Sequence, residues 1–297
     1  MRDQNKAYLL TGLVIIFWAT SASAFKIALR DVSPYLLLLY ATLFSTMALF
    51  GILCTTGKLE HLKQLNGPAV GRAALLGFLN PFLYYIILFK AYAILPGQIA
   101  MSLNYGWPLV LTLLSAPILR QRLSRSQLLA VCVSFVGAVV IASQGKLTGF
   151  GDVSRLGLLL AGGSTVIWAT YWLLNAKDNQ DPVVKLLLGF CFGCLYTIGY
   201  GFVNGQLGLP PLQAIPALVY ISLFEMSVTF TLWLTALQLS LSAARLGNLI
   251  YITPFFSLLF LHVVVKEHIY PATFVGLLLI VGSILFQGWQ DRKVDEP

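Results

Sequence analysis

Charged side chains are scarce in this chain of 297 residues. Only 10% of the residues are Asp, Glu, Lys or Arg, whereas hydrophobic residues make up 58%. A soluble domain carries about a quarter charged residues, so an aqueous fold could not cover this much apolar surface. The composition therefore excludes an ordinary soluble domain and predicts an all-α integral membrane protein, because backbone groups facing lipid must be paired within helices.

Cysteine is also rare, which limits the chemistry that the chain could support. Two of the four cysteines form Cys191-Phe192-Gly193-Cys194 inside an apolar stretch without a second ligand pair, so packing is favoured over metal binding. The chain has no Gly-x-x-x-x-Gly-Lys-Ser/Thr loop, which disfavours direct use of ATP. We therefore expect no metal, no cofactor and no enzymatic activity; an intramembrane enzyme or a channel is a distant alternative.

Apolar stretches of about 20 residues, the length needed to cross a bilayer, occupy almost the whole chain. They predict ten transmembrane helices: Leu9–Leu29, Tyr35–Thr56, Pro68–Tyr92, Gly97–Leu119, Ser126–Gln144, Leu156–Ala176, Pro182–Asn204, Ala214–Gln238, Ala243–Val265 and Pro271–Trp289.

The positions of the basic residues predict the orientation of these helices. Most of the 19 Lys and Arg fall on one set of alternate loops if both termini are cytoplasmic, as the positive-inside rule requires. Cationic loops beside an anionic leaflet also explain the net charge of +8 without nucleic acid. Membrane lipid is therefore an expected partner and nucleic acid is not.

Similar short sequences recur roughly half the chain apart. Ile16-Phe17-Trp18-Ala19-Thr20 is repeated as Val166-Ile167-Trp168-Ala169-Thr170, and Asn104-Tyr105-Gly106-Trp107-Pro108 is echoed by Ile250-Tyr251-Ile252-Thr253-Pro254. The sequence therefore predicts two five-helix repeats, at residues 7–146 and 155–290, in a single membrane domain. Because five is odd, the second repeat must enter the membrane inverted, and such repeats place a substrate site between them near the midplane.

Prolines and polar residues within the spans predict where this site lies. Pro108 and Pro254 interrupt matched helices, and Pro81 adds a break beside Asn80. Backbone carbonyl groups left unpaired by these prolines are tolerated at membrane depth only beside protein or a water-filled cavity. The alternative to a binding site here is an ordinary helix kink. Glu225 aligns with Asn80 in the repeat. We expect Glu225 either to carry protons or to form part of a polar cavity wall; the alternative is a structural carboxyl group. The roles of Lys90 and His262 stay open.

Aromatic residues near the predicted midplane suggest the cargo. Trp and Tyr offer flat apolar faces together with N–H and O–H groups, and they bind cations over their rings. Packing between helices is the alternative for any single ring, but the repeat-matched Trp18 and Trp168 favour a cavity. The candidate substrate-binding residues are Trp18, Tyr84, Tyr85, Asn104, Tyr105, Trp107, Trp168 and Tyr251.

These motifs resemble the drug/metabolite transporter superfamily, EamA type. The resemblance rests on Trp-Ala-Thr in the first helix of each half and on a Tyr-x-x-Pro break in the fourth. Asn104-Tyr105-Gly106-Trp107-Pro108 is also similar to the Asn-Tyr-x-Trp-Pro of its aromatic amino acid and paraquat exporter branch. The resemblance implies ten helices around a central cavity, and export from the bacterial cytoplasm.

We therefore expect a secondary transporter of the bacterial inner membrane that works by alternating access. Its predicted substrates are small amphipathic solutes, foremost aromatic amino acids or related aromatic metabolites and cations. The alternative is export of other amino acids or metabolites. Whether transport is coupled to protons is left open, and the protein is expected to be a monomer or a weak homodimer.

Overall fold

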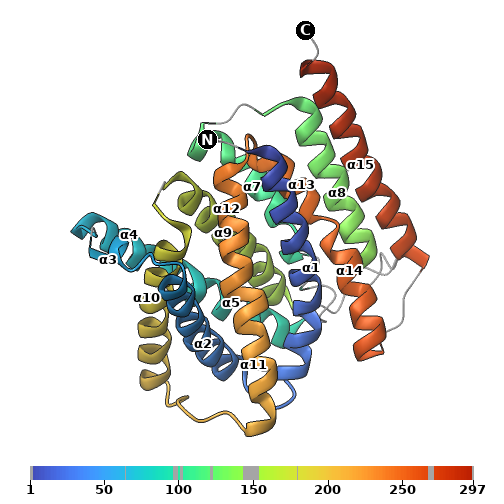
Figure 1. Cartoon of the computed structure of the whole chain (residues 1–297). Helices are drawn as coiled ribbons and strands as arrows, with labels where there is room; N and C mark the ends of the chain where they lie inside the picture. Colours follow the sequence, from blue (N-terminus) through green and yellow to red (C-terminus); the bar gives the residue numbers. More distant parts are fainter. Residues whose placement is uncertain are drawn as a thin grey trace.

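A computed structural model describes residues 3–63, 65–95, 100, 103–120, 123–142, 154–178, 180–266 and 271–295. Throughout these ranges the regular elements are helices, packed side by side as a bundle (Figure 1). The start of α1 and the end of α15 lie at the same end of the bundle, called the N-terminal end below. The expectation of an all-helical chain is thus confirmed.

The helices of the first half begin where local caps allow. They are α1 (Gln4–Ala28), α2 (Pro34–Thr55), α3 (Glu60–Lys63), α4 (Gly67–Gly77), α5 (Tyr84–Ile94), α7 (Trp107–Leu119) and α8 (Arg125–Ala142). The Asp3 side chain accepts the Lys6 N–H, and Ser33 and Asn66 cap α2 and α4 in the same way. Such side chains satisfy the free N–H groups of a first turn, so these residues fix where each helix starts.

The second half follows the same pattern. Its helices are α9 (Arg155–Lys177), α10 (Pro182–Val203), α11 (Ile215–Ile221), α12 (Val228–Leu239), α13 (Ala243–Ile250), α14 (Thr253–Phe260) and α15 (Pro271–Asp295), with a short 3₁₀ turn η2 (Leu212–Ala214) before α11. Asp181 caps α10 while Pro182 occupies its first position, where a missing N–H costs nothing.

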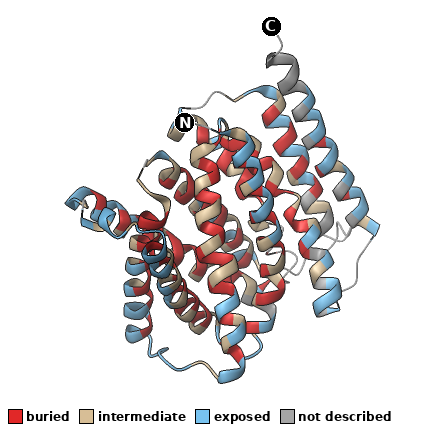
Figure 2. Ribbon diagram, in the orientation of Figure 1, coloured by how far each residue is buried: buried red, intermediate tan, exposed pale blue. Residues whose placement is uncertain are grey.

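Seven stretches of the described chain are helices long and apolar enough to cross a membrane. The other predicted spans correspond to shorter apolar helices, Trp107–Leu119, Arg125–Gly137 and Phe274–Ser283, next to residues outside the described ranges. Leu159, Phe202 and Leu278 are each more than 70% exposed on the outer face, where acyl chains would cover them (Figure 2). The chain is a multi-pass membrane protein; ten crossings stay a prediction.

Two segments interrupt helices at positions that the sequence repeat aligns: η1 is a kink with an extended backbone at Asn80, and η3 is π-helical. Segment η1 (Phe78–Leu83) joins α4 to α5 and contains Asn80 and Pro81, and η3 (Ser222–Ser227) joins α11 to α12 and contains Glu225. A third, η4 (Leu261–Val265), follows α14. π-helical segments widen the helix locally and are common at functional sites.

A second matched pair of interruptions lies next to Pro108 and Pro254. The chain forms a turn at Tyr105–Gly106 before α7 and another at Tyr251–Ile252 before α14. Each proline then occupies an early position of the following helix, where it needs no N–H partner. The predicted fourth and ninth spans are thus broken in the middle rather than continuous.

The packing pairs of the bundle link the two halves. Helix α2 packs along α10, and α8 packs along α15 at one edge of the bundle (Figure 1). Helix α1 of the first half lies against α12 of the second, and α9 of the second half lies against α5 of the first. The middle of the bundle is therefore built from both halves together.

Glycine permits a close contact between α10 and the junction of α4 with η1. A Cβ built on Gly77 would lie 2.2 Å from the Gly189 carbonyl oxygen, and one on Gly193 would lie 2.6 Å from the Pro81 ring. Glycine-x-x-x-glycine spacing lets helix backbones approach in this way. Gly189 and Gly193, one helical turn apart on α10, thus make their contact inside the bundle.

We expect Gly77→Ala to destabilise the protein and Gly199→Ala not to. The new methyl group at residue 77 would overlap backbone, which costs about 1–3 kcal/mol, whereas nothing lies within 4 Å of a Cβ on Gly199. Alanine has a higher helix propensity than glycine. The melting temperatures of the two variants should therefore shift in opposite directions or differ by several degrees. Thermal unfolding of both variants in the same detergent checks this, and equal melting temperatures would contradict the close contact.

Candidate functional site

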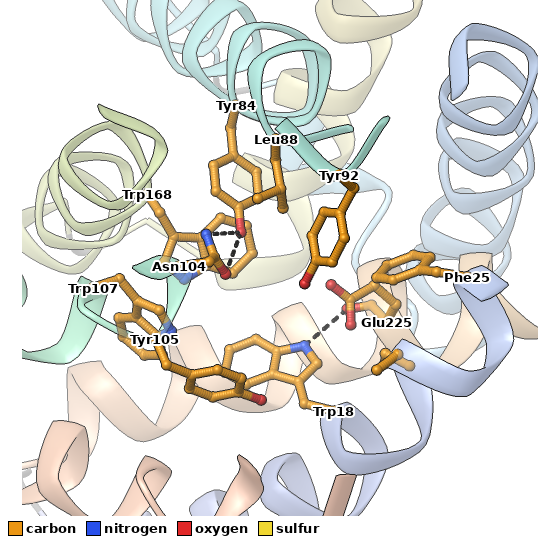
Figure 3. A pocket seen from close by; sticks show the side chains of 12 residues that line it. Trp18, Phe25, Tyr84, Leu88, Tyr92, Asn104, Tyr105, Trp107, Trp168 and Glu225 are labelled. Atoms are coloured by element: carbon orange, nitrogen blue, oxygen red, sulfur yellow. Dashed lines mark hydrogen bonds between the residues drawn. The ribbon is translucent and has the colours of Figure 1, made fainter. Parts of the chain in front are cut away.

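A cavity of about 70 Å³ lies in the middle of the bundle, between elements of both halves. Its walls come from α1, α5, η3, α7, α9 and the turn before α7 (Figure 3). The lining residues are Trp18, Ser21, Ala22, Phe25, Tyr84, Leu88, Tyr92, Asn104, Tyr105, Trp107, Trp168 and Glu225. Seven of the residues singled out from the sequence therefore meet at one cavity, namely Trp18, Tyr84, Asn104, Tyr105, Trp107, Trp168 and Glu225.

Five lining residues were not predicted: Ser21, Ala22, Phe25, Leu88 and Tyr92. They continue the helix faces that predicted residues begin. Ser21, Ala22 and Phe25 follow Trp18 by three, four and seven positions, and Leu88 and Tyr92 follow Tyr84 by four and eight. Such spacing places side chains on one face of a helix, so extending those faces from Trp18 and Tyr84 would have found them.

Tryptophan rings from four different helices meet at the floor of the cavity. The Trp18 ring centroid lies 6.0 Å from that of Trp107, 6.0 Å from that of Trp168 and 5.8 Å from that of Trp233. The ring planes are tilted or perpendicular, the arrangement that aromatic pairs prefer. Trp18 and Trp168, matched by the sequence repeat, thus face each other across the boundary between the halves.

Glu225 supplies a carboxyl group on one side of the cavity. Its Oε1 accepts a hydrogen bond from the Tyr85 hydroxyl at 2.9 Å, and its backbone carbonyl accepts one from Trp18 Nε1 at 3.3 Å. Segment η3, which carries Glu225, is π-helical and packs against α2 and α1. Glu225 is 8% exposed, so a buried carboxylate here favours a cationic or proton-donating partner.

Asn104 forms the polar wall opposite Glu225, with Tyr92 between the two in the view of Figure 3. Its Nδ2 donates to the Tyr84 hydroxyl at 3.2 Å and to Ser164 Oγ at 3.1 Å. Asn104 precedes the turn at Tyr105–Gly106, where the helix is interrupted. The break before Pro108 therefore brings a fixed amide and the Tyr105 ring to the cavity.

The indole N–H of Trp168 is buried without a hydrogen-bond partner among the described residues. The matched N–H of Trp18 donates to the carbonyl of Glu225, so the two repeats differ at this point. An unsatisfied buried donor costs about 1–3 kcal/mol. Because Trp168 lines the cavity, a bound solute with an acceptor group would remove this cost.

The remaining predicted site residues do not line the cavity. Tyr85 lies behind Glu225 as its hydrogen-bond donor. Asn80 is fully buried in η1, where it lies against Tyr171 of α9. Pro81 packs on α10, as described above. Tyr251 is fully buried in a separate cluster with Val131 of α8 and Ile280 of α15.

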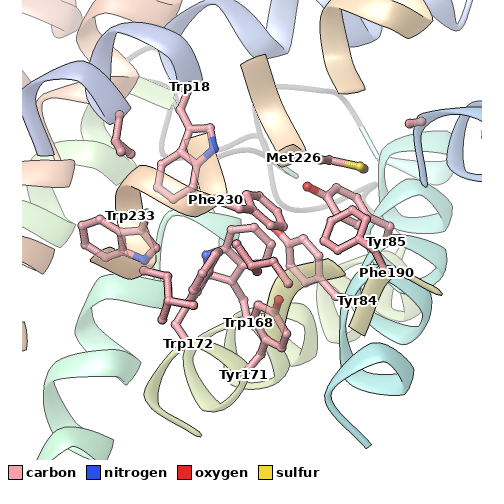
Figure 4. Close-up of a cluster of buried hydrophobic side chains, with 14 of the residues drawn as sticks. Trp18, Tyr84, Tyr85, Trp168, Tyr171, Trp172, Phe190, Met226, Phe230 and Trp233 are labelled. Atoms are coloured by element: carbon pink, nitrogen blue, oxygen red, sulfur yellow. The ribbon is translucent and has the colours of Figure 1, made fainter. Parts of the chain in front are cut away.

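Aromatic side chains close the cavity toward the N-terminal end of the bundle. Trp172, Phe230 and Trp233 are fully buried, and Trp172 lies 4.9 Å from Phe230 and 5.5 Å from Trp168 between ring centroids (Figure 4). On the other side, the lining continues away from that end, along α1 from Trp18 to Phe25 and along α5 from Tyr84 to Tyr92. The cavity therefore extends toward the end opposite the N-terminus.

Polar contacts fasten the closed end around the turn between α9 and α10. Lys58 pairs with Asp181 at 2.5 Å, Arg72 Nε lies 3.3 Å from Asp178 Oδ2, and Gln238 Nε2 donates to the Asp178 carbonyl at 2.9 Å. Burial would raise the pKa of Asp181, but Lys58 and the N–H groups of α10 outweigh it and hold that pKa below its usual value. These contacts tie α2, α4 and α12 to one turn.

Lys90 and His262, whose roles the sequence left open, are exposed in α5 and η4. The described residues contain no group of three His, Cys, Asp or Glu that could hold a metal. The cavity thus offers aromatic faces, one carboxyl group, one amide and unpaired indole N–H. This set of groups can bind a small solute that carries both an apolar ring and an amino group.

Comparison with known proteins connects this geometry to a family. The model of the EamA-like transporter family matches residues 5–143 and again residues 155–288. A protein of Bacillus subtilis named "Uncharacterized transporter YvbV" is 24% identical over 95% of this chain and 91% of its own. The "Aromatic amino acid exporter YddG" of Ancylobacter novellus is 27% identical over 64% of each chain. A solved crystal structure shares the fold, with a TM-score of 0.84 at 22% identity over 99% of this chain and 100% of that one.

Proposed function

Because this chain belongs to the EamA-like transporter family, we propose that it is a secondary exporter of aromatic amino acids and related aromatic metabolites or cations. Family membership makes it a membrane transporter rather than an enzyme. The name of the Ancylobacter novellus relative supports aromatic amino acids as cargo. The main support is the cavity itself, where rings and one carboxyl group meet without a basic residue among the described lining.

In the proposed binding mode the solute spans the cavity from Glu225 to Asn104. The Glu225 carboxylate holds the ammonium group, since charge-assisted hydrogen bonds are the stronger ones. The aromatic side chain stacks among Trp18, Trp107 and Trp168. The carboxylate or carbonyl of the solute accepts the free N–H of Trp168 and lies near Asn104 and Tyr105. Each group of an aromatic amino acid thus has a complementary group in the wall.

The cavity must widen before such a solute fits. A volume of about 70 Å³ holds about two water molecules, since each occupies about 30 Å³ in the liquid. Pockets for small molecules are about 300–1,000 Å³. The aromatic rings are therefore partly collapsed onto one another in this conformation, and substrate entry would separate them.

Alternating access between two inverted repeats is the proposed mechanism. Its support is the packing between halves: α1 on α12 has its counterpart in α9 on α5, and α2–α10 and α8–α15 each join equivalent helices. The breaks at η1 and η3 also match, as do the turns before α7 and α14. In this proposal residues 7–146 and 155–290 exchange shapes, moving the opening from one side to the other.

The proposed location is the bacterial inner membrane with both termini in the cytoplasm. The distribution of Lys and Arg supports this orientation. The end closed by Trp172, Phe230 and Trp233 then faces the cytoplasm, and the conformation described here is closed to that side. Glu225 could also carry a proton in exchange for substrate; without such coupling, the solute follows its own gradient. A monomer or a weak homodimer is the proposed assembly.

Counterflow in proteoliposomes tests the proposed substrate without assuming any coupling. Vesicles loaded with unlabelled tryptophan should accumulate labelled tryptophan and phenylalanine transiently, and much less labelled leucine or aspartate. Equal accumulation of leucine would favour the alternative, export of amino acids in general. Absence of saturation would indicate a channel, and absence of any counterflow with the whole panel would contradict the proposal.

A further inference from the structure

A second hollow lies between α4 and the end of α9, at the N-terminal end of the bundle. Its volume is about 500 Å³, well above that of the central cavity. It is lined by Arg72, Leu75, Leu76, Leu174, Lys177 and Asp178. None of these residues lines the central cavity, so this groove is a separate feature of the surface.

The two walls of the groove present the same order of side chains. In α4, the basic residue Arg72 is followed one helical turn deeper by Leu75. In α9, which runs in the opposite direction, Leu174 is followed one turn later by Lys177. Both walls thus carry a cation nearer the N-terminal end of the bundle and a leucine further from that end. An amphiphile with an anionic head and an apolar tail has this polarity.

Exposure shows that the groove is accessible from the lipid side. Leu75 is 55% exposed, and the Arg72 side chain is 53% exposed. Lys177 is also exposed, and Leu174 is half-buried. A water-soluble ligand gains nothing from exposed leucines at this depth, whereas an acyl chain covers them.

Arg72 is placed so that it can bind a second anion. Its Nε faces Asp178 Oδ2 at 3.3 Å, whereas Asp178 Oδ1 accepts the Gln180 N–H at 3.0 Å. The ion pair therefore uses the Nε edge of the guanidinium. The two terminal nitrogen atoms have no other partner among the described residues, and guanidinium groups bind phosphate with two parallel hydrogen bonds.

We propose that this groove binds an anionic phospholipid, with its phosphate between Arg72 and Lys177 and its acyl chain along Leu75 and Leu174. Basic pockets between transmembrane helices bind such headgroups elsewhere. The two cations outnumber the single acid Asp178, so the site has a net positive charge. Bound lipid bridges α4 and α9 beside the contacts that fasten the closed end of the transporter.

Native mass spectrometry of the purified chain with phosphatidylglycerol tests this. The wild-type protein should keep phosphatidylglycerol in preference to phosphatidylethanolamine of the same acyl composition. Arg72→Gln and Lys177→Gln should each weaken binding about five-fold, the effect of one cation beside an anionic surface, and the double variant more. The matched control is Lys63→Gln with Arg125→Gln, which removes two exposed cations outside the groove.

Three results would overturn the proposal. The first is equal retention of the two lipids by the wild-type protein. The second is an equal loss of phosphatidylglycerol in the control variant, because binding would then reflect overall charge. The third is displacement of the lipid by inorganic phosphate at similar concentration, because the acyl chain would then add nothing. The measurement uses no transport, so its outcome is independent of the proposed substrate.

Discussion

Replacing Glu225 by Gln is expected to lower transport of substrates with an ammonium group by about 10- to 100-fold. A hydrogen bond to a charged group contributes about 1.5–3 kcal/mol, and each 1.4 kcal/mol is a factor of ten. Gln has nearly the shape of Glu, and its amide oxygen still accepts the Tyr85 hydroxyl, which lies 2.9 Å from Oε1. The variant thus removes the charge while keeping the packing of η3.

The measurement is counterflow of tryptophan beside a neutral aromatic analogue without the amino group. Only tryptophan should lose transport in Glu225→Gln, because the analogue has no ammonium group for the carboxylate to bind. Tyr85→Phe is the companion variant: it keeps the charge and removes the hydroxyl that holds it, so we expect a smaller loss. Unchanged tryptophan transport in Glu225→Gln, or an equal loss for both solutes, would refute the ammonium site.

Replacing Trp168 by Ala is expected to weaken binding of aromatic solutes at least 30-fold. Trp168 contacts the rings of Trp18, Tyr84 and Trp107 and carries the free N–H. Truncation of a buried tryptophan at the centre of a binding site costs about 2 kcal/mol or more, which corresponds to this factor. The expected readout is a rise in the substrate concentration that gives half-maximal counterflow.

Trp172→Ala is the matched control for this variant. Trp172 lies one turn further along α9, is fully buried and does not line the cavity. Both substitutions remove a buried tryptophan and should lower the melting temperature, since such truncations cost about 3–5 kcal/mol. Only Trp168→Ala should also lower the affinity of the folded protein. Trp168→Phe keeps a ring and removes the N–H, so its affinity for the substrate should lie between those of the wild type and Trp168→Ala. Equal affinities of the wild type, Trp168→Phe and Trp168→Ala would show that the substrate binds elsewhere.

The repeated motifs singled out Trp18 and Trp168 as a matched pair before the structure showed where they lie. They occupy the same place in the two repeated motifs, and their ring centroids lie 6.0 Å apart. The prolines predicted the interruptions for a chemical reason, the missing N–H. What the sequence could not predict was the π-helical form of η3, since the extra residue per turn depends on contacts with neighbouring helices.

Tyr251 shows where repeat-based reasoning ends. The motif aligns it with Tyr105, which lines the cavity, whereas Tyr251 packs against α8 and α15. Equivalent backbone positions in two copies thus have different neighbours, and a pairwise alignment contains no information about those neighbours. Adjacent residues differ for a similar reason. Tyr84 lines the cavity, while Tyr85 points to Glu225 from behind, because successive residues of a helix face different directions.

The small volume of the central hollow influences every binding constant that experiments will yield. A solute binds only those molecules in which the rings have moved apart, so the apparent dissociation constant is the intrinsic one divided by the fraction of such molecules. Modest affinity would then reflect a rare open form rather than poor complementarity. Such weak retention suits a transporter, because cargo released quickly leaves the carrier free for its next cycle.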